Sequence, residues 1–226
     1  MPGTMATFPS NGDNTSGYLA IPANGKGPGV VVIQEWWGLV PHIKRIADRF
    51  AGAGFLAIAP DLYHGKSTKS PDEAGKLMMA INIDKAERDL AGAVSYLKGH
   101  SGNSSGKAGI VGFCMGGALS LYAATRNTDL SACVVFYGGH PKIHPDLPNL
   151  RAPLLGLYAG RDGFVTVESV RDLERKLKGL AKDHEIHIYP NCDHAFFNDE
   201  RPEVYNKEAA ADAWKRTVEF FTKHLS

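Results

Sequence analysis

The chain has 226 residues, with 25 Lys and Arg against 24 Asp and Glu, and 43% of its residues are hydrophobic. This length and composition predict one globular domain over residues 1–226 with a sizeable core, and they exclude disordered, collagen-like and coiled-coil chains. A net charge of +1 provides no concentrated basic surface, so neither nucleic acid nor a membrane is an expected partner.

The cysteines and the N-terminal residues indicate the compartment. Cys114, Cys133 and Cys192 are odd in number and widely spaced, unlike a secreted disulfide framework, and this favours a reducing environment. The first twenty residues lack Lys, Arg and the apolar run of a signal peptide, and no stretch approaches the 18 apolar residues of a membrane span. We therefore expect a cytoplasmic protein, either a monomer or a small homo-oligomer.

Short apolar runs alternate with segments of helical period along most of the chain. The first 27 residues, rich in Gly, Asn, Pro and Ser, predict a β-hairpin or an edge strand around Tyr18–Ile21. Six further strands are predicted, at Gly29–Gln34, Phe55–Pro60, Ala108–Gly112, Ala132–Tyr137, Leu154–Tyr158 and Glu185–Tyr189. The pattern predicts an α/β fold with a mainly parallel sheet and helices on both faces.

Helices are predicted between and after these strands. A capping pattern at Asp84 and Glu87 begins a helix over Asp84–Lys98, and Ser101–Lys107 has the composition of a polar loop. Two more stripes of apolar residues have helical spacing: Val170, Leu173, Leu177 and Leu180, then Trp214, Val218, Phe221 and Leu225. The second stripe predicts a C-terminal helix that packs on the sheet.

The segment Gly109–Gly117, GIVGFCMGG, carries the clearest chemical signal. An apolar strand runs into a G-x-C-x-G turn and then into a helix of small residues, Ala118–Thr125. This is the nucleophile-elbow pattern with Cys114 in the place of serine, and its glycines leave room for a sharp strand-to-helix turn. The N-terminus of the following helix favours a thiolate and a developing oxyanion.

The chain matches neither of two phosphate-binding sequence patterns, one tested around Cys114 and one tested before Lys66-Ser67. A dinucleotide fingerprint would need glycine where Cys114 stands, because the backbone must approach the pyrophosphate there. Pro60 occupies the place of the first glycine in a phosphate loop ending at Lys66-Ser67. The alternative for Cys114 is a small buried hydrophobic residue, which is also our interpretation of Cys133.

Two partners for Cys114 follow in the chain order nucleophile, acid, histidine. Asp162 and His194 each come directly after a predicted strand, so both belong to loops at the same sheet edge as Cys114. His194 would accept the thiol proton, and Asp162 would hold the imidazole in the required tautomer. Asp193 is the competing acid, although it adjoins His194 in sequence.

Gln34-Glu35-Trp36-Trp37 follows the first strong strand, where hydrolases of this architecture supply a second oxyanion N–H. Glu35 is either an exposed acid beside two packing aromatic residues or a buried acid directed at the nucleophile. His184, His187 and Cys192 lie near Asp193 and His194, but their spacing matches no zinc pattern. We expect neither a metal nor another cofactor.

The segments QEWWGL, GFCMGG, GRDGFV and DHAF together resemble the dienelactone hydrolase family, whose known enzyme is carboxymethylenebutenolidase. The resemblance runs from about Gly17 to the last helix. It implies an α/β-hydrolase domain, a Cys114–Asp162–His194 triad and an oxyanion hole at the backbone N–H groups of Met115 and Trp36. It also implies that Glu35 contacts the thiol at rest and assists its deprotonation.

The substrate side of the site departs from that family. Family members that bind a substrate carboxylate have Arg four residues after the catalytic His, where this chain has Asn198, and Arg201 is the nearby alternative. We expect Trp36, Trp37 and Tyr137 to contact the acyl group. The predicted function is a cysteine hydrolase of small-molecule esters or lactones that forms a thioester acyl-enzyme. The alternative is a non-catalytic binding or redox-sensing protein with an exposed thiol.

Overall fold

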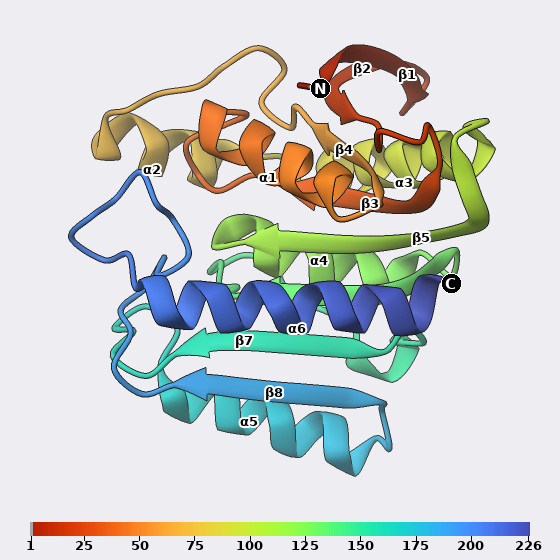
Figure 1. The fold of residues 1–226 in the computed structure, drawn as a ribbon. Helices are drawn as coiled ribbons and strands as arrows, with labels where there is room; N and C mark the ends of the chain where they lie inside the picture. The colour runs from red at the N-terminus through yellow and green to blue at the C-terminus, as the bar shows by residue number, and fades with distance from the viewer. Residues whose placement is uncertain (1) are drawn as a thin grey trace.

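The computed structural model describes residues 2–226 and contains one sheet, in the order β1-β2-β4-β3-β5-β6-β7-β8. The strands are β1 Thr4–Ser10, β2 Asp13–Ala20, β3 Gly27–Ile33, β4 Leu56–Pro60, β5 Asn103–Phe113, β6 Leu130–Phe136, β7 Leu154–Ala159 and β8 His184–Tyr189. Strands β3 to β8 run parallel to one another, as expected. The arrowheads of β5, β7 and β8 therefore point to one edge in Figure 1.

The expected N-terminal hairpin is present and forms the antiparallel edge of the sheet, β1 with β2 and β2 with β4. Its two turn residues, Asn11 and Gly12, have φ angles of 54° and 78°. Two successive residues with positive φ make a type I′ turn, whose twist matches that of the flanking strands and which favours Asn-Gly.

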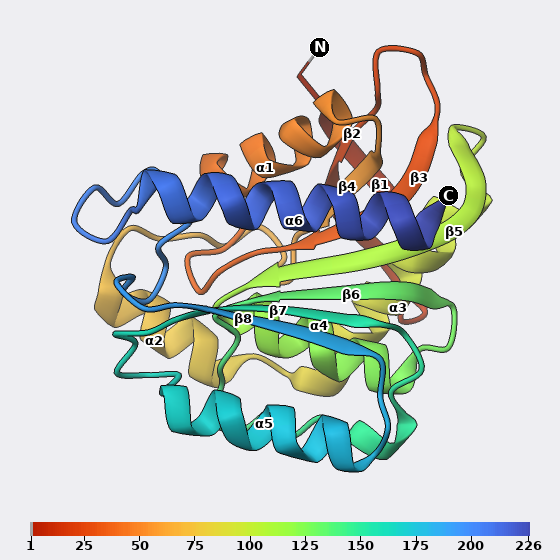
Figure 2. The same ribbon diagram turned by 60° about the horizontal axis from the view of Figure 1, so that its bottom comes forward.

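Helices cover both faces of the sheet. They are α1 Pro41–Gly52, α2 Pro71–Ala80, α3 Ile83–Gly99, α4 Met115–Arg126, α5 Val167–Gly179 and α6 Lys207–Leu225, with a 3₁₀ turn at Leu147–Asn149. Figure 2 shows α1 and α6 on one face and α2 to α5 on the other. Each face has its own apolar core, and the buried strand residues alternate between the two cores.

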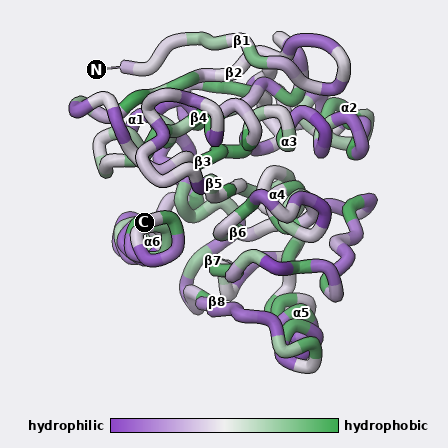
Figure 3. Tube along the Cα trace, turned by 90° about the vertical axis from the view of Figure 1, so that its right-hand side faces the viewer, coloured by the Kyte–Doolittle hydropathy of each residue, from purple (hydrophilic) through white to green (hydrophobic). Residues whose placement is uncertain are grey.

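The helix α6 closes one face as its apolar stripe predicts. Phe221 and Leu225 are fully buried, and Phe221 packs on Phe50 of α1 at 5.9 Å between ring centroids. In Figure 3, where α6 is seen end-on, hydrophilic and hydrophobic segments alternate around the helix. No helix within residues 2–226 has both the length and the apolar run that a bilayer crossing requires.

Three local expectations were wrong. The helix α3 confirms the predicted helix to within one residue at each end, but its cap is Asn82, which accepts the Lys85 N–H at 2.9 Å, and not the pattern at Asp84 and Glu87. Leu180 is the C-cap of α5 and is 40% exposed, so it does not extend the buried stripe. The polar segment Ser101–Lys107 is not all loop, because β5 already begins at Asn103 and pairs with β3 through an irregular register.

Candidate active site

Cys114 occupies the sharp turn between β5 and α4. Its φ of 55° and ψ of −120° lie in a strained region for a residue with a side chain. The turn is held by the Cys114 N–H, which donates to the Phe136 carbonyl at 3.0 Å. A methyl group at Gly116 would overlap the carbonyl oxygen of Gln34, and one at Gly117 would lie 2.7 Å from the Cα of Gly138. These close backbone approaches explain the glycines of the elbow.

The thiol of Cys114 lies at the N-terminus of α4. Met115 is the first residue of this helix, so its N–H has no intrahelical acceptor, whereas the N–H groups of Gly117 and Ala118 bond to the Cys114 carbonyl. Free N–H groups and the helix dipole favour negative charge at this position. The residue is 8% exposed, which fits a thiol that is reached through a cavity rather than from the open surface.

Asp162 is fixed in the loop after β7 by three hydrogen bonds. One carboxylate oxygen accepts the Phe164 and Val165 N–H groups, both at 2.8 Å, and the other accepts His194 Nδ1 at 2.6 Å. Burial raises the pKa of Asp162, but the hydrogen bond and the charge of His194 outweigh it, so the pKa is lowered. Asp162 is therefore ionised at neutral pH.

His194 follows β8 and lies between Asp162 and Cys114. Burial lowers the pKa of the imidazole, but the hydrogen bond to Asp162 and the interaction with the Cys114 sulfur raise it to about 10. The ring packs edge-on against Tyr137 at 5.1 Å and Phe164 at 5.8 Å. Since Asp162 occupies Nδ1, the other ring nitrogen, Nε2, is available for proton exchange with the thiol.

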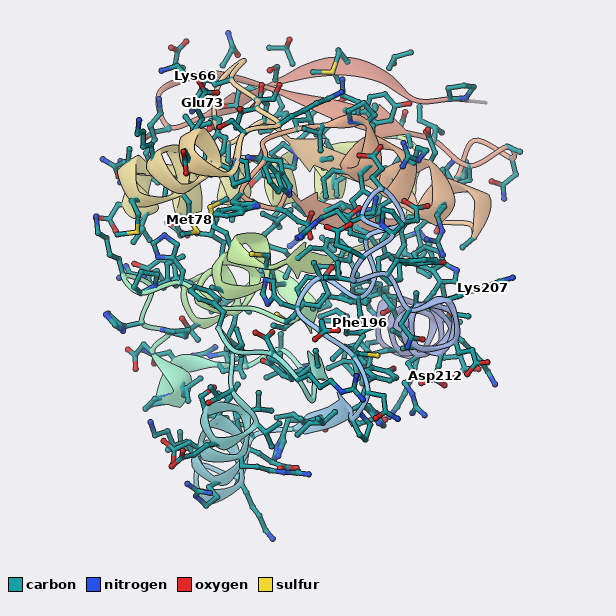
Figure 4. All side chains as sticks on the ribbon, turned by 90° about the vertical axis from the view of Figure 1, so that its left-hand side faces the viewer. Lys66, Glu73, Met78, Phe196, Lys207 and Asp212 are labelled. Carbon is teal, nitrogen blue, oxygen red and sulfur yellow. The ribbon has the colours of Figure 1, made fainter. Side chains whose placement is uncertain are left out.

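These three side chains line one cavity of 280 Å³. Its apolar wall consists of Trp36, Trp37, Met78, Phe164 and Ala195. Met78 belongs to α2 and is labelled in Figure 4, as is Phe196, whose ring packs on that of Tyr137 at 5.4 Å between centroids. A larger hollow of 460 Å³ adjoins the cavity, and Trp37 and Arg201 line both.

Glu35 also lines this cavity and is 1% exposed, so it is a buried acid rather than an exposed one. One carboxylate oxygen accepts the side-chain N–H of Asn198 at 2.7 Å, and the other accepts the Tyr137 hydroxyl at 3.4 Å. Protein donors thus occupy both oxygens of Glu35.

The expected substrate contacts are distributed differently. Trp37 and Arg201 line the cavity, and Arg201 is held by an ion pair from its Nε to Glu203 at 2.9 Å. Tyr137 is fully buried and lies behind Glu35 and His194, where its hydroxyl contacts Glu35. Asn198 also contacts Glu35. Asp193 is exposed, whereas Asp162 is the acid on the His194 ring.

The two largest cavity side chains that were not predicted from the sequence are those of Phe164 and Met78. Phe164 directly follows the Asp162-Gly163 pair, so its closeness to the acid was the available signal. Met78 offered no signal, because only the packing of α2 beside the cavity brings it there. Within residues 2–226, no group of three or more His, Cys, Asp or Glu side chains is arranged to hold a metal ion.

A sequence model described as the dienelactone hydrolase family matches residues 15–225. The chain belongs to the dienelactone hydrolase family. The expected resemblance is thus confirmed, and it identifies the chain as a hydrolase of ester or lactone bonds with an α/β-hydrolase fold.

Individual relatives of this dienelactone hydrolase family member cover nearly the whole chain. "Protein usf" of Aquifex pyrophilus is 42% identical over 99% of this chain and 100% of its own length. A "Putative carboxymethylenebutenolidase" of Aquifex aeolicus is 35% identical over 99% of both chains. The crystal structure of a "Putative Dienelactone Hydrolase" from Klebsiella pneumoniae superposes with a TM-score of 0.88 and 32% identity, covering 98% of each chain.

Proposed function

We propose that the chain hydrolyses small-molecule esters or lactones through a thioester on Cys114, with His194 as proton carrier and Asp162 as its orienting acid. The observation that carries this proposal is the position of His194, whose Nδ1 bonds to the buried Asp162 in the same cavity that Cys114 lines. Nucleophile, base and orienting acid thus adjoin one cavity.

Acylation begins when His194 takes the thiol proton. The thiolate attacks the substrate carbonyl carbon and forms a C–S bond, and the carbonyl oxygen becomes an oxyanion. The N–H of Met115 and the N–H of Trp36 are the proposed donors to that oxyanion, and such a donor contributes about 2.7–4 kcal/mol to transition-state stability. The C–O bond then breaks, and His194 gives its proton to the leaving oxygen.

Deacylation repeats these steps with water. His194 takes a proton from water, the resulting hydroxide equivalent attacks the thioester carbonyl, and the C–S bond breaks. The proton returns to the Cys114 sulfur, and the product is a carboxylic acid. The Asp162 carboxylate stabilises the imidazolium in both halves of the reaction. Glu35, the remaining acid of the cavity, is the proposed second acceptor for the thiol proton.

The cavity wall indicates the kind of acyl group. Trp36, Met78 and Phe164 provide apolar surface, and Arg201 is the permanently charged cation among the cavity residues. A neutral ester needs no charged partner in such a cavity, whereas a buried substrate carboxylate would need an ion pair with Arg201. We therefore propose that neutral short-chain aryl or alkyl esters are hydrolysed at least as well as dienelactone.

A panel of esters and lactones, run on the wild type, Cys114→Ala and Cys192→Ala, tests the proposal. We expect Cys114→Ala to lose measurable turnover on every substrate and Cys192→Ala to keep most of it. Iodoacetamide should modify Cys114 first, with proportional loss of activity. Burial raises the pKa of the Cys133 thiol to about 12, and it also raises the pKa of Cys192. Full activity in Cys114→Ala would refute the assignment of Cys114 as the nucleophile.

A further inference from the structure

The side-chain amide of Asn198 has one permitted orientation. Its Oδ1 accepts the Glu200 N–H at 3.0 Å, and its Nδ2 donates to Glu35 Oε2 at 2.7 Å. Turning the amide over would place Oδ1 against a carboxylate oxygen and the NH₂ group against an N–H donor, and both contacts would be repulsive. The backbone of the segment after β8 therefore ensures that a donor always faces Glu35.

We propose that Asn198 is a positioning residue that keeps Glu35 ionised and turned in a fixed direction in the catalytic cavity. This inference rests on the proposed function of that cavity. The amide NH₂ of Asn198 donates to Glu35, and the residue also lines the adjoining 460 Å³ hollow, so its contact with substrate stays a prediction. An arginine at this position would meet Glu35 before it met a substrate carboxylate.

Glu35 needs such a partner because it is almost fully buried and makes no ion pair within residues 2–226. A buried carboxylate without a cation is ionised only if hydrogen-bond donors replace its lost water. Asn198 at 2.7 Å is the stronger donor, and the Tyr137 hydroxyl at 3.4 Å is the weaker one. Burial, followed by the charges of Glu35 and Cys114, raises the pKa of Tyr137, so its hydroxyl keeps its proton and can donate.

The charged groups around Glu35 come from several elements. Cys114 at the start of α4 and His194 after β8 line the same cavity, as do Asp162 after β7 and Arg201 before α6. Asp199, next to Asn198, instead bonds to His42 at 3.1 Å and Arg45 at 3.2 Å. Asn198 is thus the neutral donor to the carboxylate of Glu35, while its neighbour Asp199 forms separate ion pairs.

Replacing Asn198 with Asp tests this role because the two side chains have the same shape. In Asn198→Asp, Oδ1 still accepts the Glu200 N–H, but a second carboxylate oxygen then faces Glu35 at hydrogen-bond distance. Two carboxylates in one site hold one proton between them, and the protonation of such a pair shifts by about 1–3 pH units. We expect the acidic limb of the kcat/KM profile on a neutral ester to move up by about one pH unit or more.

Three further variants separate positioning from packing. Glu35→Gln should lower activity and should not show the upward move of the acidic limb that is expected of Asn198→Asp. Glu35→Gln with Asn198→Asp restores a donor–acceptor pair with reversed polarity, so it should re-form the contact without restoring activity or the acidic shift. Asn24→Asp, which adds the same charge at an exposed turn, should leave the profile of the wild type unchanged.

The protonation state of Glu35 can also be read without turnover. Carbon-13 NMR of labelled glutamate carboxyls, with the Glu35 resonance assigned from Glu35→Gln, should show an ionised carboxyl in the wild type and a protonated or shared one in Asn198→Asp at neutral pH. Unchanged NMR and an unshifted profile in Asn198→Asp, even with a lower melting temperature, would overturn the inference. So would full activity in Glu35→Gln. Because NMR needs no substrate, it tests the role of Asn198 even if Cys114→Ala disproves the thioester mechanism.

Discussion

Asp162→Asn tests how strictly the loop after β7 controls the histidine tautomer. In the structure, Asp162 Oδ1 accepts two backbone N–H groups at 2.8 Å and Oδ2 accepts His194 Nδ1 at 2.6 Å. An asparagine must place its oxygen on the two backbone donors, since its NH₂ group would repel them. That NH₂ group then faces His194 and donates to Nδ1. The imidazole proton is forced onto Nε2, where the ring can no longer accept the thiol proton.

The expected loss follows from this tautomer change. An imidazole with the wrong tautomer, in otherwise intact geometry, lowers kcat by about 10⁴-fold in triads of this kind. Some turnover survives by the minor tautomer and the oxyanion donors, so we expect a loss of about 10³–10⁴-fold. At 1.36 kcal/mol for each factor of ten, this is about 4–5.5 kcal/mol of transition-state stabilisation.

The assay is kcat on a neutral ester for the wild type, Asp162→Asn and the matched control Asp193→Asn. Asp193 has the same chemistry and adjoins His194 in sequence, but its side chain is exposed. The control should remain within about threefold of the wild type, because surface substitutions have small effects. An Asp162→Asn enzyme within tenfold of the wild type, or an equal loss in Asp193→Asn, would refute the assignment of the acid.

Two further predictions concern stability. Gly116→Ala should lower the free energy of unfolding by about 1–3 kcal/mol, because its methyl group would overlap the Gln34 carbonyl. The melting temperature should fall by about 2–4 °C for each kcal/mol. The control Gly179→Ala, whose methyl group would enter open space, should change the melting temperature little, and equal melting temperatures of the two variants would contradict the prediction. The pKa of His194 is raised from 6.5 to about 10, so its stabilising contribution is complete below pH 6.5 and is lost as the pH rises through 10. The melting-temperature difference between the wild type and His194→Gln should therefore shrink from pH 5 to pH 10, and a growing difference would show that the sign is wrong.

The sequence determined the elbow and the order of the chemical residues. Glycines flanking Cys114 at a strand-to-helix boundary specify a sharp turn, because only residues without side chains tolerate the backbone contacts seen at Gly116 and Gly117. Short apolar runs between segments of helical period likewise located six parallel strands, five of them to within about two residues at each end. From parallel strands it followed that Cys114, Asp162 and His194 share one sheet edge.

These local patterns did not predict the contacts between elements that are distant in sequence. Met78 joins the cavity because α2 packs beside it, and no periodicity of α2 encodes that placement. Asn103 begins a strand because β3 supplies hydrogen-bond partners to a polar segment whose composition indicates a loop.

The environment of Glu35 was likewise decided by the tertiary structure. The sequence left this residue between an exposed and a buried acid, since its neighbours Trp36 and Trp37 suit either. Asn198 lies 163 positions away in the chain, and its contact with Glu35 exists only because the segments after β3 and β8 meet at one sheet edge. Hydrogen-bond geometry between such distant residues depends on the complete fold. The sequence therefore predicted the residues of the candidate triad, but not the hydrogen bonds that hold Glu35.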